Sequence, residues 1–226
     1  MRRSRAALLL AIALVLAVAG CTTKVAGTAT RDPAQPPLTL SKDGYGIVAG
    51  FDDAPTRIEI FTEPQCGHCA DLQKDFADQF AYYIGVGALK ITYRPLTFLD
   101  DAPGGYSAHV SNALFLAADG GAATGTQFQR FVKELYAHQQ RTKGGAGPSD
   151  DEIAEMAKTA GMPDEIVDRI ADGGSAVDVA DMDTNNFEYL YEIDNLTTGT
   201  PTVYDPENDE KLDIYDNNWL TKLMQT

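Results

Sequence analysis

Residues 63–69 read EPQCGHC, and the two cysteines of this stretch lie where a predicted strand gives way to a predicted helix. Upstream, residues 57–61 (RIEIF) alternate polar and apolar side chains, which predicts a strand. Downstream, residues 66–83 are predicted to form a helix, because apolar side chains recur at intervals of three and four residues. These side chains share one helix face: Cys69, Leu72, Phe76, Phe80 and Tyr83.

The two cysteines are expected to differ in chemistry. Cys66 lies at the helix N-terminus, where unpaired backbone N–H groups and the helix dipole favour a thiolate. Cys69 lies one turn later on the apolar face, so its thiol is expected to be buried and less acidic. Thiol–disulfide exchange requires this combination of one exposed, acidic sulfur and one buried, resolving sulfur.

His68 lies between the two cysteines and is expected to stabilise the Cys66 thiolate, which would make the disulfide more oxidising. A single C-x-x-C also fits a static structural disulfide, or half of a metal site. A tetrahedral zinc site needs more ligands, and neither His109 nor His138 lies at a ligand spacing from the pair. These two histidines are interpreted as helix-face residues, and we predict neither a metal nor a cofactor.

A second motif, residues 199–203 (GTPTV), directly precedes a short predicted strand. Alone it fits a simple turn from a loop into a strand. Together with an upstream C-x-x-C at a strand–helix junction, it favours a cis proline at Pro201. Such a proline would expose the preceding backbone groups to a bound extended peptide.

The elements predicted along the rest of the chain indicate an α/β fold. A second strand is predicted for residues 89–96, and a short strand pair for 202–204 and 211–215. Helices are predicted for residues 106–119, 126–139, 149–160, 163–172, 176–194 and 218–224, with a capping box at Ser149 and Glu152. This order implies a sheet with packed helices and an inserted helical region.

These motifs resemble the thioredoxin superfamily, and more narrowly its DsbA-type branch, in which a helical domain is inserted into the thioredoxin fold. The resemblance rests on residues 63–69, on residues 199–202 and on residues 93–100 (YRPLTFLD), which are similar to a strand of actinobacterial membrane-anchored members. It implies a thioredoxin-like domain over 42–226, with a helical insertion at about 106–194. It also implies that Cys66 attacks, that Cys69 resolves, and that Pro201 faces the pair as a cis proline. The Thr200 hydroxyl would then lie near the Cys66 sulfur.

The chain departs from this family at one position. Well-studied members carry a buried acid six residues before the first active-site cysteine, and this position is Ile60 here. Glu59 should point to the other face of the strand. Glu63 is expected to be exposed, so no carboxylate can be assigned as the proton acceptor from the sequence.

The first 41 residues are predicted to be a targeting signal followed by a tether. Residues 1–20 combine three arginines with an uncharged apolar run, as in a signal peptide. The run ends in VAGC at residues 18–21, which resembles a bacterial lipobox, so Cys21 is predicted to carry the lipid anchor. Residues 21–41 are then the lipidated N-terminus and a flexible tether. A plain signal peptide with an incidental cysteine is the alternative.

The composition excludes several classes of protein. The 226 residues carry 18 basic and 33 acidic side chains, a formal net charge of −15, which argues against nucleic-acid binding. The hydrophobic fraction of 44% excludes a wholly disordered chain. Three cysteines, Cys21 included, are too few for a disulfide scaffold.

The function predicted from these features is an extracytoplasmic thiol–disulfide oxidoreductase, lipid-anchored to the cell membrane. It would oxidise, or isomerise, disulfides in exported proteins that carry thiols, and a membrane redox partner would reset its active site. Two alternatives stay open: an extracytoplasmic disulfide reductase, and a lipoprotein binding module with an inert disulfide. An inert module should bury its first sulfur.

Overall fold

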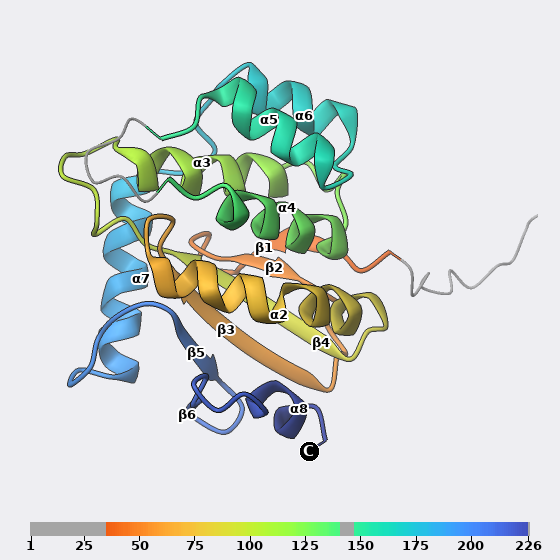
Figure 1. Ribbon diagram of the computed structural model, residues 1–226, viewed down its shortest axis with the longest axis vertical. Helices are drawn as coiled ribbons and strands as arrows, with labels where there is room; N and C mark the ends of the chain where they lie inside the picture. Colours follow the sequence, from red (N-terminus) through yellow and green to blue (C-terminus); the bar gives the residue numbers. More distant parts are fainter. Residues whose placement is uncertain (1–34, 141–146, 226) are drawn as a thin grey trace, which may run out of the picture. The chain divides into compact units, whose positions relative to one another are not determined.

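The computed structural model describes residues 35–140 and 147–225. Its strands form one six-stranded sheet, and Figure 1 shows helices packed against the sheet. The order across the sheet is β1-β2-β4-β3-β5-β6. β3 and β4 are parallel, whereas the other neighbours are antiparallel. The strands are β1 (Leu38–Leu40), β2 (Ile47–Ala49), β3 (Thr56–Thr62), β4 (Leu89–Pro95), β5 (Thr202–Asp205) and β6 (Glu210–Lys211).

Five of the helices lie between β4 and β5 and form the predicted helical insertion. They are α3 (Tyr106–Ala118), α4 (Gly125–Ala137), α5 (Asp150–Thr159), α6 (Asp164–Ala171) and α7 (Val179–Ile193). Outside the insertion lie α2 (Gly67–Gly85) and the short α8 (Trp219–Leu223). The α/β architecture with an inserted helical region is therefore confirmed. The predicted capping box is also present, with Ser149 accepting from the Glu152 backbone and the Glu152 carboxylate accepting from the Ser149 N–H.

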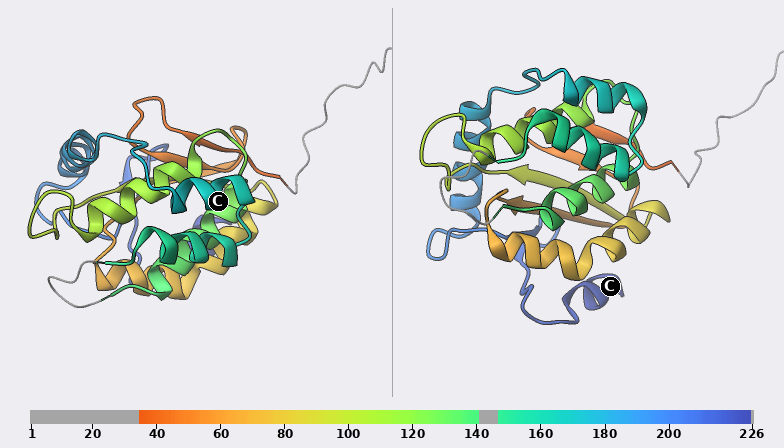
Figure 2. Two further views of the ribbon diagram at one scale, coloured as in Figure 1. Left: turned by 90° about the horizontal axis from the view of Figure 1, so that it is seen from above. Right: turned by 45° about the horizontal axis from the view of Figure 1, so that its top comes forward.

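The central strand β3 faces a different helix on each side. Ile58 and Ile60 are buried in the main core together with Phe80 of α2. The next side chain along, Phe61, belongs to a separate buried cluster with Leu190 of α7. Because strand side chains alternate between faces, α2 and α7 cover opposite faces of β3. Both views of Figure 2 accordingly show α7 apart from the layer that α2 and α4 form.

Three parts of the structure differ from the sequence-based predictions. The strands β1 and β2 were not predicted, and β1 lies inside the range predicted to be a tether. Strands of three residues are too short to show a period of two. The second strand of the C-terminal pair spans only Glu210–Lys211 instead of 211–215, because the carboxylates of Asp213 and Asp216 accept backbone N–H groups and form turns there.

Several predictions lie outside the described residues. The signal peptide, the lipidation site Cys21 and most of the tether fall within residues 1–34. Among the residues that the structure does describe, no helix has the length and apolar character needed to cross a membrane.

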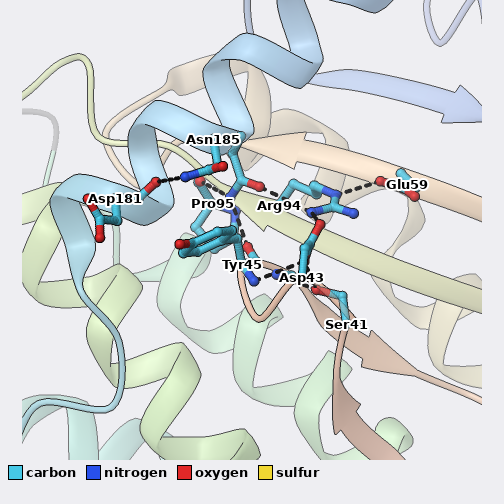
Figure 3. A network of polar contacts seen from close by, with 10 residues as sticks. Ser41, Asp43, Tyr45, Glu59, Arg94, Pro95, Asp181 and Asn185 are labelled. Carbon is cyan, nitrogen blue, oxygen red and sulfur yellow. Dashed lines mark hydrogen bonds and ion pairs between the residues drawn. The ribbon is translucent and has the colours of Figure 1, made fainter.

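A buried arginine joins the sheet to the loop before β2 and to α7, as Figure 3 shows. Arg94 on β4 is only 7% exposed. Its Nε donates to Glu59 at 2.6 Å, and its Nη1 donates to Asp43 at 2.7 Å and to Asn186 Oδ1 at 3.3 Å. The guanidinium carbon also lies 5.0 Å from the ring centre of Tyr189 on α7. One cation thus holds together four separate segments of the chain.

Candidate active site

The two cysteines occupy the predicted strand–helix junction. β3 ends at Thr62, and a turn closed by the Cys66 N–H donating to the Glu63 carbonyl at 2.9 Å leads into α2. Cys66 is the N-cap of α2, and Cys69 lies in its first turn. Both cysteines are free thiols, with Cys66 partly exposed and Cys69 fully buried. The sulfur nearer the helix end is therefore the one that a macromolecular substrate can reach.

The surroundings of the two thiols push their acidities apart. The pKa of Cys66 is lowered to about 5, chiefly because the Cys69 thiol donates a hydrogen bond to it. Burial opposes this effect, whereas the Thr200 side chain and the backbone N–H groups of Cys69 and His68 add to it. The pKa of Cys69 is raised well above its usual value, first by burial and then by its role as donor to Cys66. The two sulfurs thus differ in the direction that the sequence predicted.

A loop from the far end of the chain covers the Cys66 sulfur. The peptide bond between Thr200 and Pro201 is cis. The antiparallel register of β5 on β3 pairs Thr202 with Phe61, so the start of β5 lies at the end of β3 beside the cysteines. The Cys66 Sγ accordingly lies 3.2 Å from the Thr200 carbonyl oxygen, to which the thiol donates. A cavity of about 520 Å³, lined in part by Thr200 and Pro201, opens next to this loop.

His68 is placed differently from the other predicted site residues. Its side chain is 71% exposed, and Nδ1 lies 3.8 Å from a carboxylate oxygen of Asp71. The part of His68 that helps to lower the pKa of Cys66 is its backbone N–H. The imidazole therefore faces solvent.

The prediction that Glu63 is exposed is wrong. Its side chain is 0% exposed, and its carboxylate accepts hydrogen bonds from the Ser107 hydroxyl and from the Gln65 N–H, the latter at 2.6 Å. Burial raises the pKa of Glu63 to about 7, although both hydrogen bonds oppose the rise. The turn between β3 and α2 directs this side chain inward against α3. Because α3 is distant from Glu63 in the sequence, the sequence alone does not reveal this contact. A buried carboxylate is therefore present next to the motif, at a position other than Ile60.

The helical insertion holds the cysteine-bearing loop from a second side. Gln139, which follows α4, donates from Nε2 to the carbonyl oxygens of Pro64 at 2.8 Å and of Cys66 at 2.9 Å. The hydroxyls of Tyr136 on α4 and Thr62 at the end of β3 share a buried hydrogen bond. Sequence reasoning missed Ser107, Tyr136 and Gln139 because nothing in the local pattern marks a residue that acts across some 40 to 75 positions.

The two histidines assigned to helix faces have partners other than the cysteines. His109 pairs with Asp150 at 3.1 Å, and His138 bonds to the Glu134 backbone carbonyl at 2.9 Å. Within residues 35–140 and 147–225, no group of three or more His, Cys, Asp or Glu is arranged to hold a metal ion. Two thiols of unequal acidity can form, break and exchange disulfides.

A family model described as Thioredoxin matches residues 42–213. Among curated proteins, the serine/threonine-protein kinase PknE of Mycobacterium tuberculosis is 27% identical over 183 residues. That match covers 79% of this chain but only 31% of the kinase, so the chain spans about a third of the length of this relative.

Solved structures share the fold over most of the chain. The MdbA protein of Corynebacterium matruchotii, a thiol–disulfide oxidoreductase, has a TM-score of 0.68 at 22% identity, over 83% of this chain and 92% of that one. MdbA of Corynebacterium diphtheriae has the same TM-score at 21% identity, over 89% of this chain and 100% of that one. Oxidised DsbA of Mycobacterium tuberculosis has a TM-score of 0.58 at 19% identity, over 83% and 90%.

Proposed function

Because the chain belongs to the thioredoxin family, we propose that it is a thiol–disulfide oxidoreductase whose redox centre is the Cys66–Cys69 pair. One observation carries the proposal: an acidic, partly exposed Cys66 thiol lies against a buried Cys69 thiol, beneath a loop that contains a cis proline. A disulfide that only held the fold together would need neither the accessible sulfur nor the lowered pKa.

The exchange proceeds in two balanced steps. A substrate thiolate attacks the Cys66 sulfur of the oxidised pair, the Cys66–Cys69 bond breaks, and a mixed disulfide forms while Cys69 takes up the electron pair and a proton. A second thiolate of the substrate then attacks the substrate sulfur that is bonded to Cys66. The substrate disulfide forms, and Cys66 leaves as a thiolate. The substrate gains a disulfide and loses two protons, of which Cys69 keeps one.

The oxidising direction is favoured over reduction. A Cys66 pKa of about 5 keeps this group ionised at neutral pH, and this stabilises the dithiol form relative to the disulfide. Because the pKa of Cys66 is lowered, this stabilisation of the dithiol form is complete above pH 9, near the ordinary pKa of the thiol. It is lost as the pH falls through 5. The same property would weaken the protein as a reductase. We propose that the His68 imidazole adds to this effect, so H68A should make the reduction potential more negative.

The proposed substrates are exported proteins with free thiols, and the proposed setting is the outer side of the cell membrane. The lipobox-like residues 18–21 support this setting. A membrane redox partner would reoxidise the pair. Isomerase activity is a further candidate, since attack by the Cys66 thiolate on a wrong disulfide is the same chemistry.

The decisive test is the equilibrium between the protein and glutathione, followed by mass shift after alkylation. We expect a potential less negative than about −200 mV, well above the value of about −270 mV that is typical of thioredoxin. Stoichiometric oxidation of a reduced two-cysteine peptide should accompany it. A potential near that of thioredoxin would favour the reductase instead, and a pair that never exchanges with glutathione would favour the inert binding module.

Alkylation should distinguish the two thiols in the reduced protein. We expect iodoacetamide at pH 6 to label Cys66 first, with a rate that follows the thiolate fraction and has its midpoint near pH 5. Cys69 should resist labelling because its sulfur is buried and its pKa is raised. Peptide mapping gives the site of label, and preferential labelling of Cys69 would contradict the assignment.

Membrane attachment can be tested without the enzyme assay. Replacing Cys21 by alanine should release the protein from the membrane fraction or leave it unprocessed, because the lipid-bearing thiol is lost. Fractionation and intact mass provide the measurement. A C21A protein that stays membrane-bound with its usual mass would exclude the lipid anchor while leaving the redox assignment intact.

A further inference from the structure

The sulfur that leaves when the disulfide opens lies in a fully buried site. Cys69 is 0% exposed, so water does not solvate the negative charge that its sulfur gains during exchange. Burying such a charge is costly unless hydrogen-bond donors are directed at it. The redox pair therefore needs donors beside the Cys69 sulfur, in addition to those that serve Cys66.

The hydroxyl of Thr62 is one of these donors. Burial raises the pKa of Cys69, whereas hydrogen bonds to its sulfur from the Glu63 backbone N–H and from the Thr62 hydroxyl oppose the rise. Thr62 is the last residue of β3 and is 2% exposed. Because strand side chains alternate, Thr62 points to the same face as Ile58 and Ile60, which lie in one buried cluster with Cys69. The strand thus directs this hydroxyl at the buried sulfur.

The Thr62 hydroxyl is itself held by Tyr136. The two hydroxyls share a buried hydrogen bond that joins the end of β3 to α4, the helix that packs along α2 (Figure 2). Burial and the charge that Cys69 can carry raise the pKa of the Tyr136 phenol well above its usual value, so the phenol keeps its proton. A threonine hydroxyl has a single proton. When this proton points at the sulfur, the Thr62 oxygen accepts from Tyr136.

The backbone leaves the Thr62 hydroxyl little freedom. The Thr62 carbonyl accepts from the Leu96 N–H at 2.8 Å, and Thr62 pairs with Pro95 in the parallel register of β3 and β4. The side chain of threonine is branched at Cβ, which makes it stiff about χ1. A donor that is fixed in this way needs little reorganisation when charge develops on its partner.

We propose that Thr62 is a further catalytic residue of thiol–disulfide exchange, which donates a hydrogen bond to the Cys69 sulfur while that sulfur is negatively charged, and that Tyr136 positions its hydroxyl. This inference rests on the proposed function and adds two residues to it. In the opening step, a thiolate attacks the Cys66 sulfur, the Cys66–Cys69 bond breaks, and its electron pair moves to the Cys69 sulfur. No proton moves in this step, and both hydroxyls keep theirs. The Cys69 thiolate takes up its proton afterwards from solution.

This arrangement predicts a distinct kinetic signature. The raised pKa of Cys69 keeps its thiol protonated at neutral pH, so the thiolate exists only in passing between the disulfide and the dithiol. Removing the Thr62 donor should therefore slow opening and closure of the disulfide by the same factor and leave the reduction potential unchanged. A change that acts on Cys66 would move the potential, because the Cys66 thiolate persists in the reduced protein.

The test measures both directions in the whole protein at pH 7. Oxidised protein is mixed with reduced glutathione to follow opening, and reduced protein is mixed with glutathione disulfide to follow closure, both by acid quench and intact mass. T62V keeps the shape of the side chain without its hydroxyl and should slow both steps on the order of 10- to 100-fold. T62S restores a hydroxyl and should stay within about threefold of wild type. The attack of Cys66 on glutathione disulfide, which precedes closure, should keep its wild-type rate.

Two buried tyrosines provide matched variants. Y136F removes the phenol oxygen that orients Thr62 and should slow both steps by a smaller factor than T62V. The double variant T62V/Y136F should be no slower than T62V, because Tyr136 acts through Thr62. Tyr93 is also buried, but its hydroxyl donates to Gln129. Y93F loses a buried phenol hydroxyl in the same way and should keep wild-type rates.

The outcomes separate this inference from the proposed function. T62V with wild-type rates, or with a shifted potential and a shifted Cys66 pKa, would overturn the role of Thr62. If T62V does not fold, Y136F and Y93F decide, and equal slowing of the two would reduce Tyr136 to a structural role and overturn the proposal. If glutathione never opens the wild-type disulfide, the proposed function fails instead. Opening by dithiothreitol then still compares T62V with wild type, and equal rates there would exclude the donor.

Discussion

Replacing Cys66 by serine is expected to reduce the oxidation of a two-cysteine peptide to the rate of the mixture without protein, a loss of about three orders of magnitude or more. Cys66 carries the only sulfur of the pair that substrate can reach, because Cys69 is 0% exposed. A serine hydroxyl stays protonated at neutral pH and forms no disulfide, so neither the attack nor the mixed disulfide remains possible. Stopped-flow assays with the wild-type protein at equal concentration provide the measurement.

The matched variant is C69S, which separates the attacking role of Cys66 from the resolving role of Cys69. Cys66 keeps its position at the N-cap of α2, and a serine at position 69 can still donate a hydrogen bond to it. We expect C69S to attack disulfides and to accumulate mixed disulfides with peptides or glutathione, because the resolving sulfur is missing. Gel shift under non-reducing conditions would show the difference. Equal behaviour of C66S and C69S would contradict the division of labour between the two thiols.

Replacing Arg94 by methionine is expected to lower the free energy of unfolding by about 3–5 kcal/mol, the largest effect on stability that we predict. The guanidinium group is buried and joins Glu59, Asp43 and Asn186. Methionine fills a similar volume, but it leaves the Glu59 carboxylate, whose side chain is only 14% exposed, without its cation. Removing one partner of a buried pair costs far more than the pair contributes. Urea unfolding at pH 7 measures the change.

Two further variants check the cause. Arg57 pairs with Glu207 at 3.4 Å on the surface, with both side chains at least 40% exposed, so R57M should cost less than about 1 kcal/mol. The double variant R94M/E59L removes both buried charges and should recover most of the loss. If R94M costs no more than R57M, or if E59L fails to rescue it, the stability does not depend on the burial of this charge network.

The sequence predicts best those parts of the fold that depend on residues close together in the chain. α2 begins within one residue of the predicted position, because the apolar spacing and the strand before it are both visible in the sequence. The capping box at Ser149 and Glu152 likewise needs only four consecutive residues. The positions of Cys66 at the N-cap of α2 and of Cys69 one turn later on its buried face are likewise set by the local sequence. For these features, nearby residues determine the structure.

The features that the sequence did not reveal depend on distant partners. Glu63 is buried because Ser107, 44 residues later, lies over it. The hairpin of β1 and β2 exists because β2 pairs with β4, more than forty residues away, and its strands are too short to show a period. Arg94 lies in a strand whose pattern indicates burial, yet its partners Asp43 and Asn186 come from opposite ends of the chain. In each case a tertiary contact decides the position of the side chain.

The position of the Thr200–Pro201 loop has a consequence for the newly made chain. The Cys66 sulfur meets the Thr200 carbonyl across 134 residues of sequence, and the Ser107, Tyr136 and Gln139 contacts also come after the cysteines. A ribosome delivers residues at about 5–20 per second, so the two cysteines precede β5 by on the order of ten seconds. During that interval the Thr200 side chain, which helps to lower the pKa of Cys66, is still missing from the site. The full reactivity of the two thiols arises only when the last third of the chain has been synthesised and has folded onto the cysteines.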